Sequence, residues 1–176
     1  EDATKAFEYL RTLPSIENKP IGVLGFSLGG AIGILLSAKQ QEKINALALW
    51  SSVDNFEQTF IKAFSIEAFE KAKKAGLVEL DLGWRKIVLS NNFFESLKIF
   101  DLKEALKKLK IPFLSIRGEK DPITPDHNLF NIITSKEKEL LSFEKADHIF
   151  GVLNKEENFS KELIEKTTLW FSEILT

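Results

Sequence analysis

The sequence predicts an α/β fold in which helices flank a mostly parallel sheet, with one insertion between two of its strands. The main evidence is a run early in the chain: residues 21–26 form an apolar strand pattern, residues 28–39 an apolar helix pattern and residues 44–50 a second strand pattern. A strand, a helix and a strand in this order form a right-handed parallel unit. Apolar strand patterns at residues 111–117 and 139–143 continue the same alternation.

Helices are expected on the faces of this sheet. Residues 2–12 place apolar side chains on one helical face and stop before Pro14. Asp101 and Glu104 can cap another helix, and a short one is expected around residues 125–133. A closing helix is expected to be capped by Asn154 with Glu157, and its predicted apolar stripe consists of Phe159, Leu163, Leu169, Trp170 and Ile174.

The segment 54–100 breaks the alternation and is predicted to be a cap inserted into a core made of residues 1–53 and 101–176. Its pattern predicts, in order, a helix marked by Phe56, Phe60 and Phe64, a helix at 65–75, and a hairpin of strands at 78–82 and 84–89. Seven of the fifteen phenylalanines lie here, which favours a lid over an apolar pocket, although packing of the insertion itself explains them equally well.

Composition narrows the possible functions. A chain of 176 residues that is 44% hydrophobic can bury a core, and a net charge of −2 without a basic block argues against nucleic acid or an anionic membrane as partners. No apolar run approaches the roughly 20 residues that span a bilayer, so we expect a soluble, cytoplasmic protein. The chain does not begin with Met, and a removed signal peptide is compatible with that.

The supply of reactive side chains is narrow. Cysteine is absent, which excludes disulfides, thiolate metal sites and a cysteine nucleophile. The two histidines, His127 and His148, are too few for a histidine-rich metal site. These counts argue against a thiolate or histidine-rich metal site, and the sequence implies neither a metal nor an organic cofactor.

Ser27 lies where the first strand pattern turns into the first helix pattern. Residues 25–29, Gly-Phe-Ser-Leu-Gly, fit G-x-S-x-G, in which a tight strand-to-helix turn exposes a nucleophilic serine. The helix N-terminus adds a positive dipole end and free N–H groups that suit a developing oxyanion. The alternative is a glycine-rich connection whose serine only caps the helix, but the strand before and the small residues after favour a nucleophile.

An activated serine needs a base and an acid that orients the base. Asp121 follows the strand at 111–117 and His148 follows the strand at 139–143, so both belong to the same rim of a parallel sheet as Ser27. Asp54, after the strand at 44–50, is a second candidate acid, but it is better explained as the cap of the first helix in the insertion. His127 is expected to be solvent exposed, and Asp147 to face away from its neighbour's ring.

Three blocks carry a resemblance to a known family: Gly-Phe-Ser-Leu-Gly-Gly, Gly-Glu-Lys-Asp-Pro-Ile-Thr-Pro and Lys-Ala-Asp-His-Ile-Phe. They resemble the catalytic blocks of α/β-hydrolases of the dienelactone hydrolase, cinnamoyl or feruloyl esterase and prolyl-oligopeptidase-like branches. The resemblance implies Ser27 as nucleophile, Asp121 as acid, His148 as general base and the Leu28 backbone N–H as one oxyanion donor. It implies hydrolysis of a small carboxylic ester with an apolar or aromatic acyl group, and we expect Phe26, Trp84 and Phe93 to contact substrate.

Two other functions remain open: a serine peptidase acting on short peptides, and a hydrolase fold used as a non-catalytic binding module. The chain also departs from the family pattern, because only 26 residues precede Ser27, whereas the family has several strands before its nucleophile strand. The strand at 21–26 would then be an unpaired apolar edge. Three explanations are open: the sequence is the C-terminal part of a longer protein, a second polypeptide segment or a swapped copy completes the sheet there, or the chain is a reduced hydrolase. We favour the first two.

Overall fold

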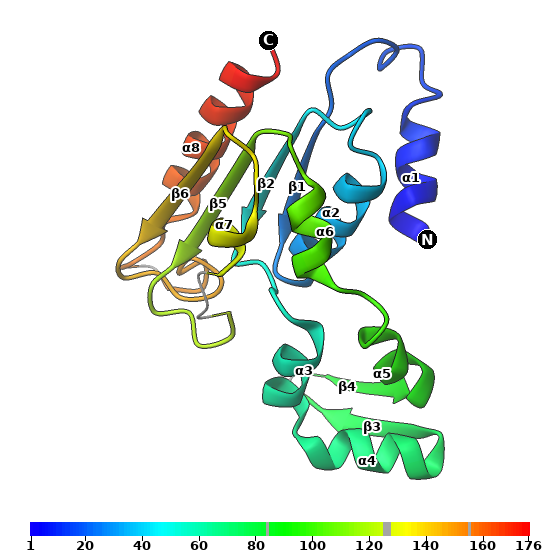
Figure 1. Cartoon of the computed structure of the whole chain (residues 1–176). Helices are drawn as coiled ribbons and strands as arrows, with labels where there is room; N and C mark the ends of the chain where they lie inside the picture. The colour runs from blue at the N-terminus through cyan, green and yellow to red at the C-terminus, as the bar shows by residue number, and fades with distance from the viewer. Residues whose placement is uncertain (84, 125–127, 155) are drawn as a thin grey trace. The chain divides into compact units, whose positions relative to one another are not determined.

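A computed structural model describes residues 1–83, 85–124, 128–154 and 156–176 of the chain. It divides the chain into two compact units (Figure 1). The first unit comprises Glu1–Val53 and Leu102–Thr176, and the second comprises Asp54–Asp101. Each unit has its own sheet and its own helices.

The first unit is built on a four-stranded parallel sheet in the order β1-β2-β5-β6. Its strands are β1 (Gly22–Phe26), β2 (Ala46–Trp50), β5 (Phe113–Gly118) and β6 (Lys138–Phe143). The register sets Phe26 beside Trp50, and Trp50 beside Ile116, so the carboxyl ends of these strands form one rim. The predicted α/β class with a mostly parallel sheet is confirmed.

Helices cover this sheet on both faces (Figure 1). The helices of the unit are α1 (Asp2–Leu10), α2 (Leu28–Lys39), α6 (Leu102–Lys108), α7 (Asn128–Ile132) and α8 (Ser160–Ile174). Strand pleating directs alternate side chains to opposite faces. A Cβ added to Gly22 would meet Phe171 of α8, whereas one added to Gly33 of α2 would meet Val23. The α8 face therefore takes Gly22, Leu24 and Phe26 of β1, and the α2 face takes the residues between them.

Strand β2 shows why this sheet is stable. Ala46, Leu47, Ala48 and Leu49 are all fully buried, so the strand is covered on both faces, as a central parallel strand must be. Ala46 and Ala48 pack into a cluster with α8, through Leu163 and Trp170. Burying each large apolar side chain contributes about 1.5–3 kcal/mol.

Strand β1 is an edge of the sheet in the described part of the chain. Two of its apolar side chains remain largely exposed, Leu24 at 46% and Phe26 at 41%. An exposed apolar edge strand offers unpaired backbone groups to another strand. The expected polypeptide beside residues 21–26 stays a prediction.

The second unit packs three helices against a two-stranded antiparallel hairpin. In chain order its elements are α3 (Phe56–Phe64), α4 (Ile66–Ala75), β3 (Leu77–Asp81), β4 (Lys86–Ser90) and α5 (Asn91–Leu97). Its interior is aromatic: the Phe93 ring meets Phe60 edge-on at 5.3 Å and Phe94 at 5.3 Å. Helix α5 was not expected from the sequence. Ser90 caps it by accepting a hydrogen bond from the Phe93 N–H at 3.3 Å.

Two predicted helix caps are wrong. Asn55, not Asp54, caps α3, because its side chain accepts the Gln58 N–H at 2.9 Å. Helix α8 begins at Ser160, and Asn158 accepts the Ser160 N–H, whereas Asn154 accepts the Glu156 N–H in a separate turn before the helix. At α3 the residue next to the predicted cap takes its place, whereas the N-cap position of α8 is Phe159, which makes no side-chain cap bond.

The predicted stripe of α8 is wrong at one position. Leu169 is 62% exposed, and the buried residues of the helix are Leu163, Thr167 and Trp170. These three are spaced i, i+4, i+7, which is one face of a helix, and Leu169 lies off that face. Thr167 tolerates burial because its hydroxyl donates to the Leu163 carbonyl at 2.8 Å and accepts the Trp50 indole N–H at 2.9 Å.

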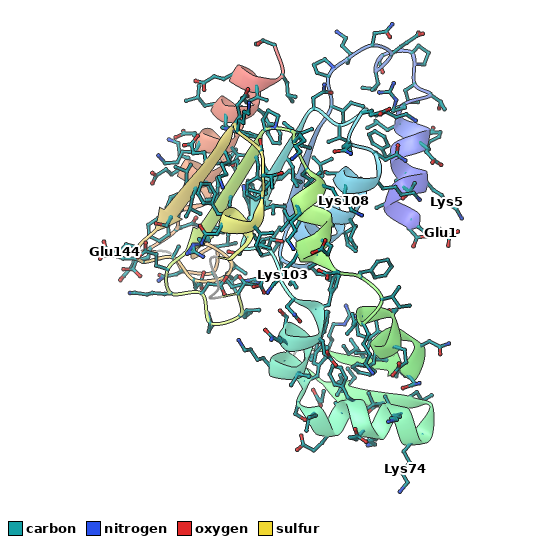
Figure 2. The ribbon with its side chains drawn as sticks, in the orientation of Figure 1. Glu1, Lys5, Lys74, Lys103, Lys108 and Glu144 are labelled. Atoms are coloured by element: carbon teal, nitrogen blue, oxygen red, sulfur yellow. The ribbon has the colours of Figure 1, made fainter. Side chains whose placement is uncertain are left out.

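Charged side chains lie on the helix surfaces, and some of them interact favourably with the helix dipoles. Lys74 and Lys108 lie in the last turns of α4 and α6, where a cation is favourable (Figure 2). Lys5 pairs with Glu1 at 2.8 Å, but both side chains are exposed, so the pair adds little stability. None of the helices in the described part of the chain is both long enough and apolar enough to cross a bilayer.

Candidate active site

Ser27 occupies the corner between β1 and α2 with a strained backbone. Its φ of 54° and ψ of −121° lie in a region that residues other than glycine rarely adopt. The Ser27 N–H donates to the Trp50 carbonyl at 2.9 Å, and its carbonyl accepts the Val53 N–H at 3.1 Å. The side chain does not cap α2, contrary to the alternative of a capping serine. The hydroxyl is thus held at the rim and left for another partner.

The glycines of the elbow have different roles. A Cβ on Gly25 would lie 2.5 Å from the Gly29 carbonyl oxygen and 2.6 Å from the Gly30 Cα, so only glycine fits there. A Cβ on Gly30 would overlap the Ser52 side chain. A Cβ on Gly29 would have no atom within 4 Å apart from its adjacent residues and the nearby backbone of α2 itself. Close packing of β1 on α2 therefore depends on Gly25, and the close approach of Ser52, after β2, to α2 depends on Gly30.

His148 bridges the other two predicted residues. Its Nδ1 lies 2.8 Å from Asp121 Oδ2, and its Nε2 lies 2.9 Å from Ser27 Oγ. A carboxylate can only accept, so Nδ1 carries the ring proton of the neutral imidazole. Nε2 is then an acceptor, and the Ser27 hydroxyl donates to it. The structure brings Ser27, Asp121 and His148 together in the order that nucleophilic catalysis requires.

Asp121 is buried, and its side chain has no exposed surface. Burial by itself would raise the pKa of this carboxyl. Hydrogen bonds oppose that effect: His148 Nδ1–H and the Thr124 hydroxyl both donate to Oδ2, and the N–H groups of Ile123 and Thr124 donate to Oδ1. Together they hold the pKa of Asp121 well below its ordinary value. The residue therefore carries a negative charge beside the imidazole at neutral pH.

The loops that carry Asp121 and His148 are tied to one another. The Lys120 N–H donates to the Ala146 carbonyl at 3.0 Å, and a Cβ on Gly118 would overlap that same carbonyl. Asp147 accepts the N–H groups of Ile149 and Gly151 and so folds the chain after His148. These bonds fix the acid relative to the base.

Thr124 is a site residue that sequence reasoning missed. It is 7% exposed, and its hydroxyl donates to Asp121 Oδ2 at 2.5 Å, the oxygen that also accepts from His148. A signal was present, since Asp followed three residues later by Thr is a common spacing for a side chain bonded within a turn.

The residues expected to contact substrate have different outcomes. Phe26 is 41% exposed and its ring centroid lies 5.2 Å from that of His148. Phe93 is half-buried and packs against Phe60 and Phe94 of the second unit, and its contact with substrate stays a prediction. Trp84 and His127 lie outside the residues that the structure describes.

The predicted oxyanion donor is the backbone N–H of Leu28, the first residue of α2. This N–H has no acceptor inside the helix and is therefore available to an oxyanion.

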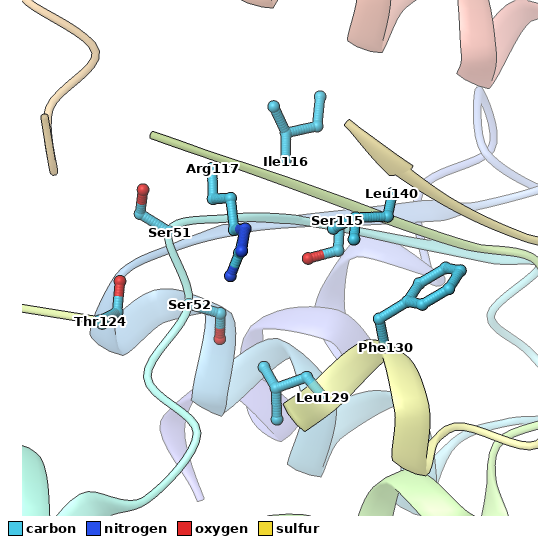
Figure 3. Close-up of a pocket in the computed structure, with 9 residues that line it drawn as sticks. All are labelled: Ser51, Ser52, Ser115, Ile116, Arg117, Thr124, Leu129, Phe130 and Leu140. Carbon is cyan, nitrogen blue, oxygen red and sulfur yellow. The ribbon is translucent and has the colours of Figure 1, made fainter. Parts of the chain in front are cut away.

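A polar pocket lies beneath the site, on the side of Thr124. It is lined by the buried residues Ser51, Arg117 and Thr124, among others (Figure 3). Its volume is about 10 Å³, which leaves room for about one water molecule and none for an ester. In the described residues, no group of three or more histidine, aspartate or glutamate side chains is placed to hold a metal ion.

The sequence matches a family model over residues 3–157, the family described as BAAT / Acyl-CoA thioester hydrolase C terminal. The chain belongs to this family. Together with the likeness of the fold to solved structures, this match confirms the resemblance to α/β-hydrolases.

Relatives of this family member include Protein bem46 of Schizosaccharomyces pombe, which is 31% identical over 151 residues. That match covers 84% of the chain and 44% of the relative, so the chain spans less than half of the relative's length. Among solved structures, the monoacylglycerol lipase of Paleococcus ferrophilus has a TM-score of 0.70 at 18% identity, covering 96% of this chain and 73% of that one. Est1E of Butyrivibrio proteoclasticus with bound ferulic acid has a TM-score of 0.67 at 18% identity, covering 96% and 65%. At these identities the solved structures show a common fold.

Proposed function

We propose that the chain is a serine hydrolase that cleaves carboxylic esters through an acyl-enzyme on Ser27, with an apolar acyl group. The observation that carries the proposal is the bridging imidazole of His148, 2.9 Å from the Ser27 hydroxyl and 2.8 Å from the Asp121 carboxylate. Three side chains 94 and 27 residues apart along the chain meet at one rim in the geometry of an activated nucleophile.

In the first half of the reaction, Ser27 Oγ attacks the ester carbonyl carbon while His148 Nε2 takes the hydroxyl proton. The carbonyl oxygen becomes an oxyanion, and the Leu28 N–H at the start of α2 stabilises it. Asp121 stabilises the imidazolium that forms. The C–O bond to the alcohol then breaks, the alcohol leaves with the proton from Nε2, and the acyl group stays on Oγ.

In the second half, a water molecule takes the place of the alcohol. His148 Nε2 removes a proton from the water as it attacks the acyl carbonyl, and the same oxyanion site is used again. The bond to Oγ breaks, Ser27 recovers its proton from the imidazolium, and the carboxylic acid is released. A second oxyanion donor is expected from a further loop, and removing one such donor typically costs about 100-fold or more in turnover.

The test is hydrolysis of p-nitrophenyl acetate and butyrate by the purified chain, compared with Ser27→Ala and Ser172→Ala. Ser172 is an exposed serine of α8 and serves as a matched control. Ser27→Ala should reduce kcat by about 10⁴-fold or more, and Ser172→Ala should leave it unchanged. A fluorophosphonate should label Ser27 in the wild type and not in Ser27→Ala. Absence of both turnover and labelling would instead favour a binding module.

The family description favours a thioester as a second candidate substrate, since it names acyl-CoA thioester hydrolysis. The same steps apply, with a thiol leaving in place of an alcohol. To compare thioester with ester substrates, the rate of free thiol release from butyryl-CoA is measured beside the rate of p-nitrophenyl butyrate cleavage at equal concentration. Cleavage of short peptide p-nitroanilides in preference to both would favour a peptidase.

A further inference from the structure

The hairpin of the second unit exposes apolar side chains on one of its two faces. In the described part of the chain, β3 and β4 form a sheet of two strands (Figure 1). Val78 is 2% exposed, whereas Leu77 and Val88, whose side chains point to the opposite face, are 52% and 61% exposed. A sheet of two strands is marginally stable by itself, and additional strands stabilise it.

The backbone of β4 has hydrogen-bonding groups that β3 does not use. The Asn91 N–H donates to the Gly76 carbonyl at 2.8 Å, just beyond one end of the hairpin. The Leu82 N–H donates to the Arg85 carbonyl at 2.9 Å at the other end. Opposed residues of an antiparallel pair alternate between hydrogen-bonded and non-bonded pairs, so these two bonds fix the alternation between them. The residues of β4 whose N–H and carbonyl groups then point away from β3 are Lys86, Val88 and Ser90.

Charge decides which strand of the hairpin can pair with a copy of itself. A two-fold antiparallel pair of β4 strands centred on Val88 sets Val88 opposite its own copy and Lys86 opposite Ser90. Lys86 meanwhile keeps its ion pair with Glu79 of the same chain, at 3.2 Å. The equivalent pair of β3 strands, centred on Glu79, would set that carboxylate opposite its own copy, and like charges directly opposite are destabilising.

Pairing of unlike strands has a different drawback. If β3 of one copy paired with β4 of the next, the contact would be head-to-tail and each copy would keep one open strand edge. Such a contact does not close and continues into a filament. A two-fold pair of β4 strands is therefore the closed arrangement that the charges of the hairpin favour.

We propose that the outer edge of β4 binds a second copy of this chain, so that two hairpins form one four-stranded antiparallel sheet. The two Val88 residues lie at the two-fold axis and exchange N–H to carbonyl hydrogen bonds with one another. The Ser90 N–H of each copy donates to the Lys86 carbonyl of the other copy. The two Val88 side chains cover one another at the centre of the face that is exposed in the single chain.

Sedimentation velocity of the full chain over a range of concentrations tests this proposal. Val88→Lys and Val88→Glu each place like charges opposite one another at the axis and should raise the Kd of the dimer at least about tenfold. An equimolar mixture of these two variants should restore the dimer, because opposite charges then meet. Leu77→Lys is the matched control, since Leu77 is similarly exposed on the same face but lies on the strand remote from the axis, and its Kd should be unchanged.

Cross-linking gives an independent measurement, because the chain contains no cysteine. Val88→Cys introduces a single thiol with little change in size. Opposed residues of an antiparallel pair have Cα atoms about 5.5 Å apart or closer, so a short bismaleimide should link two copies of Val88→Cys into a covalent dimer. Leu77→Cys should remain largely monomeric under the same conditions.

The outcomes decide the proposal in either direction. A wild-type chain that sediments as a monomer at every concentration, with no cross-link in Val88→Cys, would overturn it. So would a dimer that Val88→Lys leaves intact, or one that Leu77→Lys dissociates as strongly, because the contact would then lie elsewhere. Failure of the Lys and Glu variants to pair when mixed would exclude the two-fold register at Val88. If circular dichroism shows that the charged variants do not fold, the cross-linking of Val88→Cys against Leu77→Cys decides.

Discussion

The hydroxyl of Thr124 offers the most direct test of how Asp121 is held. Thr124→Val keeps the shape of the side chain and removes one hydrogen bond to a carboxylate. Hydrogen bonds to charged groups contribute about 1.5–3 kcal/mol. Because the Asp121 side chain has no exposed surface, water cannot replace the lost donor. We therefore expect the free energy of unfolding to fall by about 2–3 kcal/mol at pH 7.

A double-mutant cycle isolates the charge in this interaction. In an Asp121→Asn background the acceptor is neutral, and the same Thr124→Val change should cost only about 0.5–1.5 kcal/mol. Urea denaturation of the four proteins, followed by circular dichroism, measures each free energy. Thr124 shares Oδ2 with His148, so Thr124→Val should also lower kcat for p-nitrophenyl acetate about tenfold, with little change in KM.

Thr167→Val is the matched control for this cycle. Thr167 is another buried threonine, but its partners, the Leu163 carbonyl and the Trp50 indole, are uncharged. Thr167→Val should lower the free energy of unfolding by the same amount in the wild type and in the Asp121→Asn background. A Thr124→Val cost that is the same in both backgrounds would refute the reasoning, because the threonine would then not act through the carboxylate.

Three further predictions follow from the geometry. Gly25→Ala should lower the free energy of unfolding by about 1–3 kcal/mol and abolish ester cleavage because its Cβ overlaps the backbone of α2, whereas Gly29→Ala should be neutral or slightly stabilising. The pKa of Asp121 is lower in the folded state than in the unfolded chain. Its carboxylate therefore stabilises the fold above about pH 4, and this contribution is lost as the pH falls through the folded pKa. The difference in unfolding free energy between the wild type and Asp121→Asn should accordingly shrink in acid. Leu106→Ala empties a fully buried position and should cost about 2–5 kcal/mol.

Each of these has an outcome that would contradict it. Equal damage from Gly25→Ala and Gly29→Ala would mean that the elbow is sensitive to any side chain, not to the close approach at Gly25. A stability difference between the wild type and Asp121→Asn that stays constant from pH 7 to about pH 3 and below would show that the carboxylate is not the stabilised form. A Leu106→Ala cost below about 1 kcal/mol would show that α6 does not pack as described.

Much of the fold was predictable because most of the apolar patterns in the sequence are compatible with only one type of secondary structure. The strand at Gly22–Phe26, the turn at Ser27 and the helix at Leu28–Lys39 follow from apolar runs separated by glycines. Where two neighbouring residues had similar chemistry, prediction failed: Asn55 displaced Asp54 as the cap of α3. Helix α5 was missed because its seven residues, Asn91–Leu97, make less than two full turns, too short a run to establish a period.

The sequence by itself determined the parallel α/β class, the elbow serine and the position of Asp121 and His148 after consecutive parallel strands, because strand order and chain order decide which loops share a rim. Only the tertiary structure decided the distances within that rim and the role of Thr124. Those depend on how loops and α8 pack against one another across the sheet. Contacts between residues remote in sequence leave no periodic signal along the chain, so their geometry is known only once the chain is folded.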